Sequence, residues 1–110
     1  FDSIIAFGKN SSMPHYRAGS TTLKAHDIVL VDIGVVVDGY ASDMTRTFFF
    51  GKPDARLEEI YDIVLAAQEQ SIESVRPEIS CAELYEVSKK AIEKAGYGDK
   101  YLHGLGHGIG

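Results

Sequence analysis

The sequence predicts an α+β fold, with antiparallel strands in the first half of the chain and two helices in the second. Two observations carry this prediction. A β-branched run from Ile28 to Val37 is followed by the dipeptide Asp38-Gly39 and a second apolar stretch, which together are the signal of a β-hairpin. After Pro53 the apolar residues recur instead at the three- and four-residue spacing of helices.

The strands and the first loop follow from local composition. A short apolar run over Ser3 to Phe7 stops at Gly8 and predicts the first strand. Residues Lys9 to Lys24 are rich in Gly, Ser, Asn, Thr and Pro, which favours a long loop. The run from Ile28 to Val37 is almost continuously apolar, so we expect a single buried strand there.

The hairpin turn sets the register of the next strand. Asp38-Gly39 suits a two-residue type I′ turn, because both of its positions tolerate the left-handed conformation. Such a turn pairs Val37 with Tyr40, and the returning strand should then run from Tyr40 to Phe50.

Two helices are expected after the hairpin. Pro53 suits the first position of a helix that should run to near Val75. Ser80 and Glu83 form a capping box, in which each side chain satisfies a backbone N–H of the other residue, so a second helix should begin there. Gly96 is the expected stop of that helix.

Composition excludes several classes of protein. The chain has 110 residues, 45% of them hydrophobic and 25% charged, which is ordinary for one globular domain. Its net charge of −5 argues against a nucleic-acid partner. An apolar run of ~18 residues is missing, so we expect no membrane span. The single cysteine, Cys81, excludes an intrachain disulfide and favours a reducing compartment.

The hairpin register places two carboxylates on one face. Asp32 should lie opposite Thr45, and Asp43 opposite Gly34, so the two acids become diagonal neighbours about 7–8 Å apart at the backbone. Two ionised carboxylates this close repel each other and lose hydration. A divalent cation between them, protonation of one acid, or pairing with a base such as Arg46 would each relieve the repulsion, and the residues leave these alternatives open.

The histidines allow a functional and an ordinary interpretation. His103 and His107 alternate with glycines, which makes a helix unfavourable. In an extended segment their backbones would lie about 13 Å apart, so they could not share one metal ion. Each could then serve a different part of a binding groove, or both could be exposed in a glycine-rich loop. His15 lies in the first loop, where a solvated and a functional role are both open.

Four stretches of this sequence resemble the metallopeptidases of the pita-bread fold, a family that includes aminopeptidase P, prolidase and methionine aminopeptidase. The most specific is an Asp-x-Gly strand leading into Gly-Tyr-x-x-Asp-x-Thr-Arg-Thr. The four stretches are Asn10 to Tyr16, Val31 to Gly34, Gly39 to Thr47, and His103 to Gly110. The resemblance implies a partial pita-bread fold, in which a curved antiparallel sheet is backed by the two helices.

The resemblance also implies a two-metal site. The family holds two divalent metal ions through two Asp, one His and two Glu, and a metal-bridging hydroxide attacks the peptide bond. By motif, Asp32 is similar to the acid that chelates one metal and Asp43 to the acid that bridges both. His107 is similar to the ligand of the other metal, His103 to the catalytic histidine near the substrate, and His15 to a histidine of the substrate groove. Manganese is the expected metal, with cobalt, zinc or iron as alternatives.

Within this family, Asp-x-Thr-Arg-Thr and the doubled histidine resemble the Xaa-Pro branch. That branch implies a cytoplasmic enzyme acting on peptides with proline at the second position, with homo-oligomers open for the full-length protein. A methionine aminopeptidase and a metal-free binding relative are the alternatives. The family's two Glu ligands lie downstream of the His-Gly-Leu-Gly-His motif. We therefore expect residues 1–110 to be a partial catalytic domain, inactive alone, without those Glu segments and without the branch's N-terminal domain.

Overall fold

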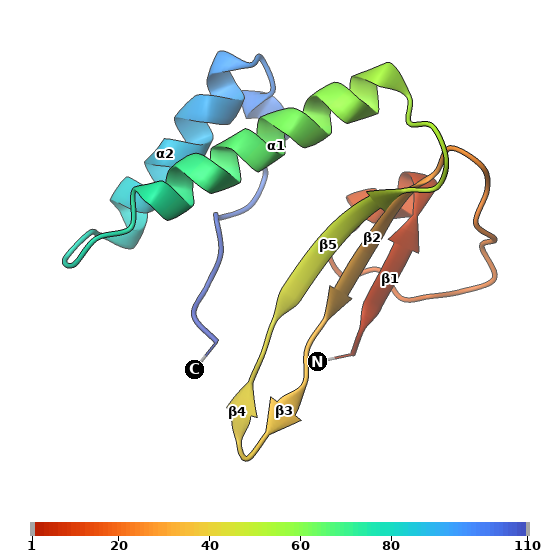
Figure 1. Cartoon of the computed structure of the whole chain (residues 1–110), viewed down its shortest axis with the longest axis horizontal. Coiled ribbons are helices and arrows are strands. Elements are labelled where there is room, and N and C mark those ends of the chain that lie inside the picture. The colour runs from red at the N-terminus through yellow and green to blue at the C-terminus, as the bar shows by residue number, and fades with distance from the viewer. Residues whose placement is uncertain (1, 110) are drawn as a thin grey trace. The chain divides into compact units, whose positions relative to one another are not determined.

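The computed structural model describes residues 2–109, and these form two compact units (Figure 1). The first unit contains the residues up to Leu57, together with Gly108 and Ile109. The second unit contains Glu58–His107. The sequence suggests one domain and places no boundary, because no linker composition separates the two parts. Along the chain, the division after Leu57 falls within the first turn of a helix rather than in a loop.

The first unit is built on a three-stranded antiparallel sheet with the strand order β1-β2-β5 (Figure 1). Its strands are β1 (Ile4–Phe7), β2 (Ile28–Ile33) and β5 (Met44–Phe49). The position of the first strand is confirmed, whereas a continuous returning strand over residues 40–50 is wrong, because it is interrupted at residues 42–43. β2 is central and pairs with both neighbours. Gly8 ends β1 with a φ of +56°, a conformation that glycine adopts readily.

The loop after β1 is more ordered than its composition suggests. Residues Gly8–Ser12 form a 3-10 helix, so a loop over the whole of Lys9 to Lys24 is wrong at its start. The cause is local: Ser11 donates its hydroxyl to the carbonyl of Gly8 at 2.8 Å, and Ser12 does the same to Lys9 at 2.8 Å. These bonds span three residues, which is the spacing of a 3-10 turn.

Beyond the sheet, the hairpin continues as a two-stranded ribbon of β3 (Val36–Val37) and β4 (Tyr40–Ala41) (Figure 1). Its turn residues Asp38 and Gly39 have φ values of +51° and +85°. Two consecutive positive φ values are the mark of a type I′ turn, so the predicted turn is confirmed. The predicted pairing of Val37 with Tyr40 is confirmed as well.

The expectation of one buried strand from Ile28 to Val37 is wrong in its second half. β2 is mostly half-buried, whereas Val36 is 71% exposed. β1 pairs with β2 only as far as Asp32, so the hairpin beyond that point has no third strand beside it among the described residues. An apolar run indicates strand character but does not say how many neighbours the strand has.

The first helix of the second part of the chain is α1 (Ala55–Glu73). It begins two residues after Pro53 rather than at that residue. Asp54 accounts for the shift, because its Oδ1 accepts a hydrogen bond from the backbone N–H of Arg56 at 2.9 Å. An Asp that satisfies a free N–H at the start of a helix is a favourable N-cap. The helix ends within two residues of the expected position.

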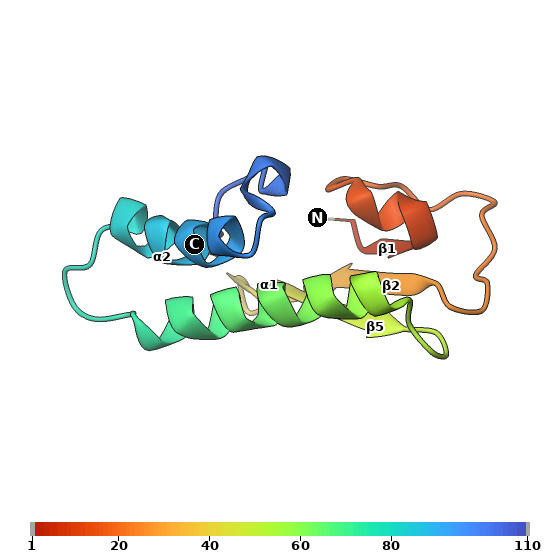
Figure 2. The ribbon, with the colours of Figure 1, turned by 90° about the horizontal axis from the view of Figure 1, so that it is seen from above.

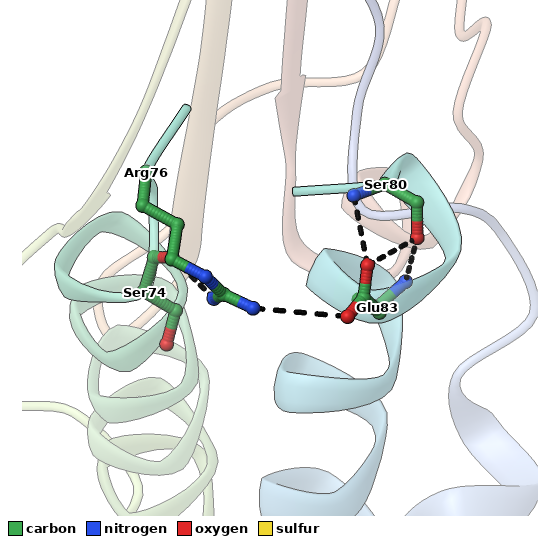
Figure 3. A network of polar contacts seen from close by, with 4 residues as sticks. All are labelled: Ser74, Arg76, Ser80 and Glu83. Atoms are coloured by element: carbon green, nitrogen blue, oxygen red, sulfur yellow. Dashed lines mark hydrogen bonds and ion pairs between the residues drawn. The ribbon is translucent and has the colours of Figure 1, made fainter. Parts of the chain in front are cut away.

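The second helix, α2 (Cys81–Lys94), runs in the opposite direction to α1 (Figures 1 and 2). Its capping box is confirmed: Ser80 Oγ accepts from the N–H of Glu83 at 3.1 Å, and Glu83 Oε2 accepts from the N–H of Ser80 at 3.0 Å (Figure 3). The Arg76 guanidinium lies 3.7 Å from the other carboxylate oxygen of Glu83. Gly96 ends the helix with a φ of +85°, as expected.

The buried residues are few and mostly small. Ala6 is buried in the sheet. Each helix buries residues four positions apart, which lie on one helix face: Ala67 and Ser71 on α1, Ser88 and Ile92 on α2. Within the described residues, neither helix has an apolar stretch long enough to cross a lipid bilayer.

Candidate functional site

Asp32 is held at the end of β2 by its partner across the hairpin. It lies opposite Thr45, as the sequence predicts, and Thr45 donates its hydroxyl to Asp32 Oδ1 at 2.9 Å. Arg46 does not neutralise this acid, because its Nη1 donates instead to the backbone carbonyl of Thr45 at 2.8 Å. Among residues 2–109, Asp32 forms no ion pair with any base. Within the described residues, the half-buried Asp32 side chain therefore has a hydroxyl partner but no paired cation.

Asp43 lies where the ladder between the two strands is interrupted. The strand pairing stops after Ile33–Met44 and resumes in the ribbon at Val36–Ala41. The gap between these pairs contains two residues of each strand. Val35 and Ser42 bridge it: the Ser42 N–H donates to the Val35 carbonyl at 2.8 Å, and the Val35 N–H donates to Ser42 Oγ at 3.1 Å.

The equal gap means that no residue is inserted in either strand, so the alternation of faces continues through it. Asp43 therefore shares a face with Thr45, two residues away, and with Asp32 opposite Thr45. A diagonal pair of this kind lies about 7–8 Å apart at the backbone. Two carboxylates at this spacing offer the oxygen ligands that hard and borderline divalent cations prefer, so their chemistry fits a metal site.

His15 lies in the first unit on a loop that Asn10 anchors. The Asn10 side chain is buried, and its Nδ2 donates to the hydroxyl of Tyr16 at 3.0 Å and to that of Thr21 at 3.1 Å. These two bonds tie both sides of the loop to its base. His15 itself is exposed at a turn directly before Tyr16, so its ring is accessible to a ligand.

His103 and His107 belong to the second unit and are exposed. Their segment is neither helix nor strand in its described part, which confirms that the glycines exclude a helix. His103 Nδ1 lies 2.7 Å from the carbonyl oxygen of Gly104, and its ring packs edge-to-face against Tyr101 at a centroid distance of 5.4 Å. The expected separation of the two histidines stays a prediction.

The structure thus assembles the candidate residues in two groups. Asp32, Asp43 and His15 lie in the first unit, and His103 and His107 in the second. Throughout the described part of the chain, no three His, Cys, Asp or Glu side chains converge on one metal position. The hairpin brings the two candidate acids together, whereas the candidate ligand His107 belongs to the second unit.

Three further residues support these candidates, and the sequence alone assigns none of them that role. Thr45 holds Asp32, Asn10 anchors the loop of His15, and Tyr101 packs on His103. The predicted register already placed Thr45 opposite Asp32, so its role could have been inferred. The roles of Asn10 and Tyr101 depend on contacts between segments, for which the sequence carries no signal.

His26 has a structural role that its sequence context does not suggest. It adopts a φ of +73°, and its Nδ1 lies 2.6 Å from the carbonyl of Lys52. Its backbone N–H donates to the carbonyl of Phe50 at 2.7 Å. These bonds extend the pairing of β2 and β5 by one further step, away from the acids. His26 therefore belongs to the frame of the sheet and not to the candidate site.

Comparison with known proteins gives the family. Residues 1–110 match metallopeptidase family M24. The Xaa-Pro dipeptidase of Pyrococcus furiosus is 41% identical over 110 residues, which are 100% of this chain and 32% of that protein. The solved structure of prolidase from Pyrococcus furiosus superposes with a TM-score of 0.97 at 41% identity, over 100% of this chain and 33% of that one.

A second solved structure, the X-Pro aminopeptidase of Thermotoga maritima, superposes with a TM-score of 0.95 at 34% identity, over 100% of this chain and 31% of that one. The chain spans about a third of the length of the curated relatives that it matches. Its α+β architecture is accordingly one part of a larger pita-bread fold. The chain belongs to metallopeptidase family M24.

Proposed function

We propose that the intact protein is a two-metal peptidase that hydrolyses the peptide bond preceding proline. The observation that carries this proposal is the placement of Asp32 and Asp43 on one face of a hairpin, with Asp32 free of any described base. Charged acids in such an arrangement favour a bound divalent cation. The printed names of the relatives, an Xaa-Pro dipeptidase and an X-Pro aminopeptidase, support proline as the second residue of the substrate.

The side chains would divide the work of holding two metal ions. Asp32 would chelate one ion, Asp43 would bridge both, and His107 would bind the second ion. When bound, the ions lower the pKa of a water molecule and polarise the scissile carbonyl. We propose that residues 1–110 form part of the catalytic domain and that two Glu ligands come from elsewhere in the intact protein. Manganese is the proposed metal, and the cytoplasm the proposed location.

The remaining candidates would act on the substrate. His103 presents an exposed imidazole that can hold or deliver a proton near the scissile bond. His15 would line the groove, on a loop that Asn10 keeps in one conformation. Ordering this loop before substrate arrives lowers the entropy cost of binding.

The proposal is tested on the intact, manganese-loaded protein with peptides that differ at one position. Ala-Pro, a longer peptide beginning Ala-Pro, and the same peptides with alanine in place of proline form matched pairs, and a Met-Ala peptide tests the methionine alternative. We expect cleavage only before proline, and loss of activity on chelation. Preferred cleavage after methionine would overturn the proline specificity. Absence of both cleavage and stoichiometric metal would identify a metal-free binding relative instead.

Metal identity and assembly are separate measurements on the same protein. Reconstitution of the chelated protein with manganese, cobalt, zinc or iron should restore the highest kcat/KM with manganese. Sedimentation of the intact protein reports whether it self-associates, which the proposed chemistry does not require.

A further inference from the structure

A chain of contacts in the second unit leads from helix α2 to His103. The ring of Tyr101 stacks on Tyr85, with centroids 5.6 Å apart and an interplanar angle of 23°. The Tyr101 ring also packs edge-to-face against His103, with ring centroids 5.4 Å apart and an interplanar angle of 73°. Both geometries are favoured by the charge distribution of aromatic rings. Tyr101 is therefore fixed in place by α2 and in turn packs on the histidine.

The hydroxyl of Tyr101 is anchored as well. It lies 3.1 Å from the hydroxyl of Ser88, a residue that is only 1% exposed. Ser88 donates its own proton to the backbone carbonyl of Tyr85 at 2.9 Å. Since Ser88 has one proton and that proton is engaged, Tyr101 must donate to Ser88 Oγ. The direction of this bond restricts the position of the Tyr101 ring.

The hydrogen bond of His103 determines which of its ring nitrogens carries the proton. Nδ1 lies 2.7 Å from the carbonyl oxygen of Gly104, and a carbonyl only accepts hydrogen bonds. Nδ1 must therefore carry a hydrogen, and in the neutral ring the lone pair lies on Nε2. Nε2 is then the ring atom that can accept a proton or a hydrogen bond from a ligand.

We propose that Tyr101, held by Ser88 and Tyr85, is a positioning residue that keeps His103 in the Nδ1–H tautomer with Nε2 presented to substrate. The part of this inference that concerns substrate rests on the proposed peptidase function. The part that concerns the imidazole does not, because its tautomer can be measured in the absence of turnover. Gly104 follows His103 directly and restricts the backbone less than other residues do, so a side-chain support is what would hold the ring.

The first measurement is the 15N spectrum of the intact, metal-free protein labelled at histidine, with His103 assigned through His103→Gln. We expect the wild type to show Nδ1 protonated in the neutral ring. Tyr101→Leu removes both ring contacts and should give a mixture of the two tautomers. Tyr101→Phe removes the hydroxyl bond to Ser88, whereas Ser88→Ala removes that bond together with the bond from Ser88 to the Tyr85 carbonyl. Both should give a smaller change than Tyr101→Leu, and the double variant should show no more than Ser88→Ala alone.

A matched control is Tyr97→Phe, which removes a hydroxyl that makes no hydrogen bond within the described residues. It should leave the His103 spectrum unchanged. In the active protein, Tyr101→Phe should lower kcat about threefold to tenfold, the rate equivalent of one hydrogen bond, with KM within about twofold. A merely structural role would instead lower the amount of folded enzyme without changing the tautomer.

Two results would overturn the inference. One is an Nε2–H tautomer in the wild type, and the other is a wild-type His103 spectrum in folded Tyr101→Leu. Should Tyr101→Leu fail to fold, Tyr101→Phe and Ser88→Ala decide the matter, because a wild-type spectrum in both would equally reject it. A protein that shows the expected tautomers but cleaves no Xaa-Pro peptide would retain the positioning role and reject the proposed function.

Discussion

Thr45 donates its hydroxyl to Oδ1 of Asp32 across 2.9 Å, between residues that the β2–β5 register places directly opposite each other. A β-branched side chain has few rotamers, so this hydroxyl is held in a narrow range of positions. The bond fixes one carboxylate oxygen of Asp32 and leaves Oδ2 for another partner. Orientation of a ligand by a neighbouring hydrogen bond is a common requirement of metal sites.

Thr45→Val should therefore weaken metal binding without removing a ligand. The substitution keeps the branched shape but loses the hydrogen bond, so Asp32 samples more orientations. We expect the affinity of the intact protein for Mn²⁺ to fall by about 10-fold or more. Titration calorimetry on the chelated protein measures this change directly.

Two further variants serve as controls for the threonine. Thr45→Ser keeps the hydroxyl and should retain most of the affinity. Thr47→Val makes the same change two residues farther along β5, on the same face but opposite Leu30. It should leave metal binding unaffected. A normal affinity in Thr45→Val would show that Asp32 is not oriented by this bond.

Neutralising Asp43 and neutralising Asp32 should have different effects on the metal content of the intact protein. Asp43→Asn removes the proposed bridge and should abolish binding of both metals, whereas Asp32→Asn should mainly weaken one. Asp38→Asn makes the same change of charge in the turn of the same hairpin, where Asn is equally suited to a positive φ, and should keep full metal content. Elemental analysis of the purified proteins distinguishes the three. Equal metal in wild type and Asp43→Asn would contradict the bridging role.

The hairpin could be predicted from sequence because its determinants are local. Asp38-Gly39 specifies the turn, the turn specifies the register, and the parity of the register places Asp32 and Asp43 on one face. The exposure of Val36 could not be predicted, since it depends on where β1 ends and not on the residues of the hairpin. Strand identity is thus a local property, whereas burial is a property of the assembled sheet.

Around His103, too, the backbone conformation could be predicted from local sequence, whereas the side-chain contacts could not. The alternating glycines after His103 make a helix unfavourable, which follows from the low helix propensity of glycine. The support of His103 by Tyr101 depends on α2, which delivers Ser88 and Tyr85 to the ring. Ser88 and Tyr85 are three residues apart and so share a helix face, but the sequence does not say which later residue that face would meet.

Asn10 should control the loop that carries His15. Asn10→Ala leaves the hydroxyls of Tyr16 and Thr21 without their shared donor and should destabilise the loop by about 1–3 kcal/mol. We expect faster proteolytic cleavage within residues 13–24 and a higher KM, with little change in kcat. Ser12→Ala, which removes an exposed hydroxyl bond at the same end of the loop, is the control. Unchanged proteolysis in Asn10→Ala would show that the loop is ordered by other contacts.

The capping box should make the stability contributed by α2 depend on pH. The backbone N–H of Ser80, then its hydroxyl, and to a smaller extent Arg76, lower the pKa of Glu83. The folded state therefore favours the ionised carboxylate, and its contribution is present above the ordinary glutamate pKa and lost as the pH falls through the lowered value. Glu83→Ala should lower the urea midpoint at pH 7, and this loss should shrink as the pH falls through the lowered pKa of Glu83, because the wild-type carboxyl then loses its charge as well. Glu86→Ala removes an acid from the same helix whose partner, among the described residues, is the half-buried Lys89. An equal pH-dependent loss in that variant would show that the capping box is not the cause.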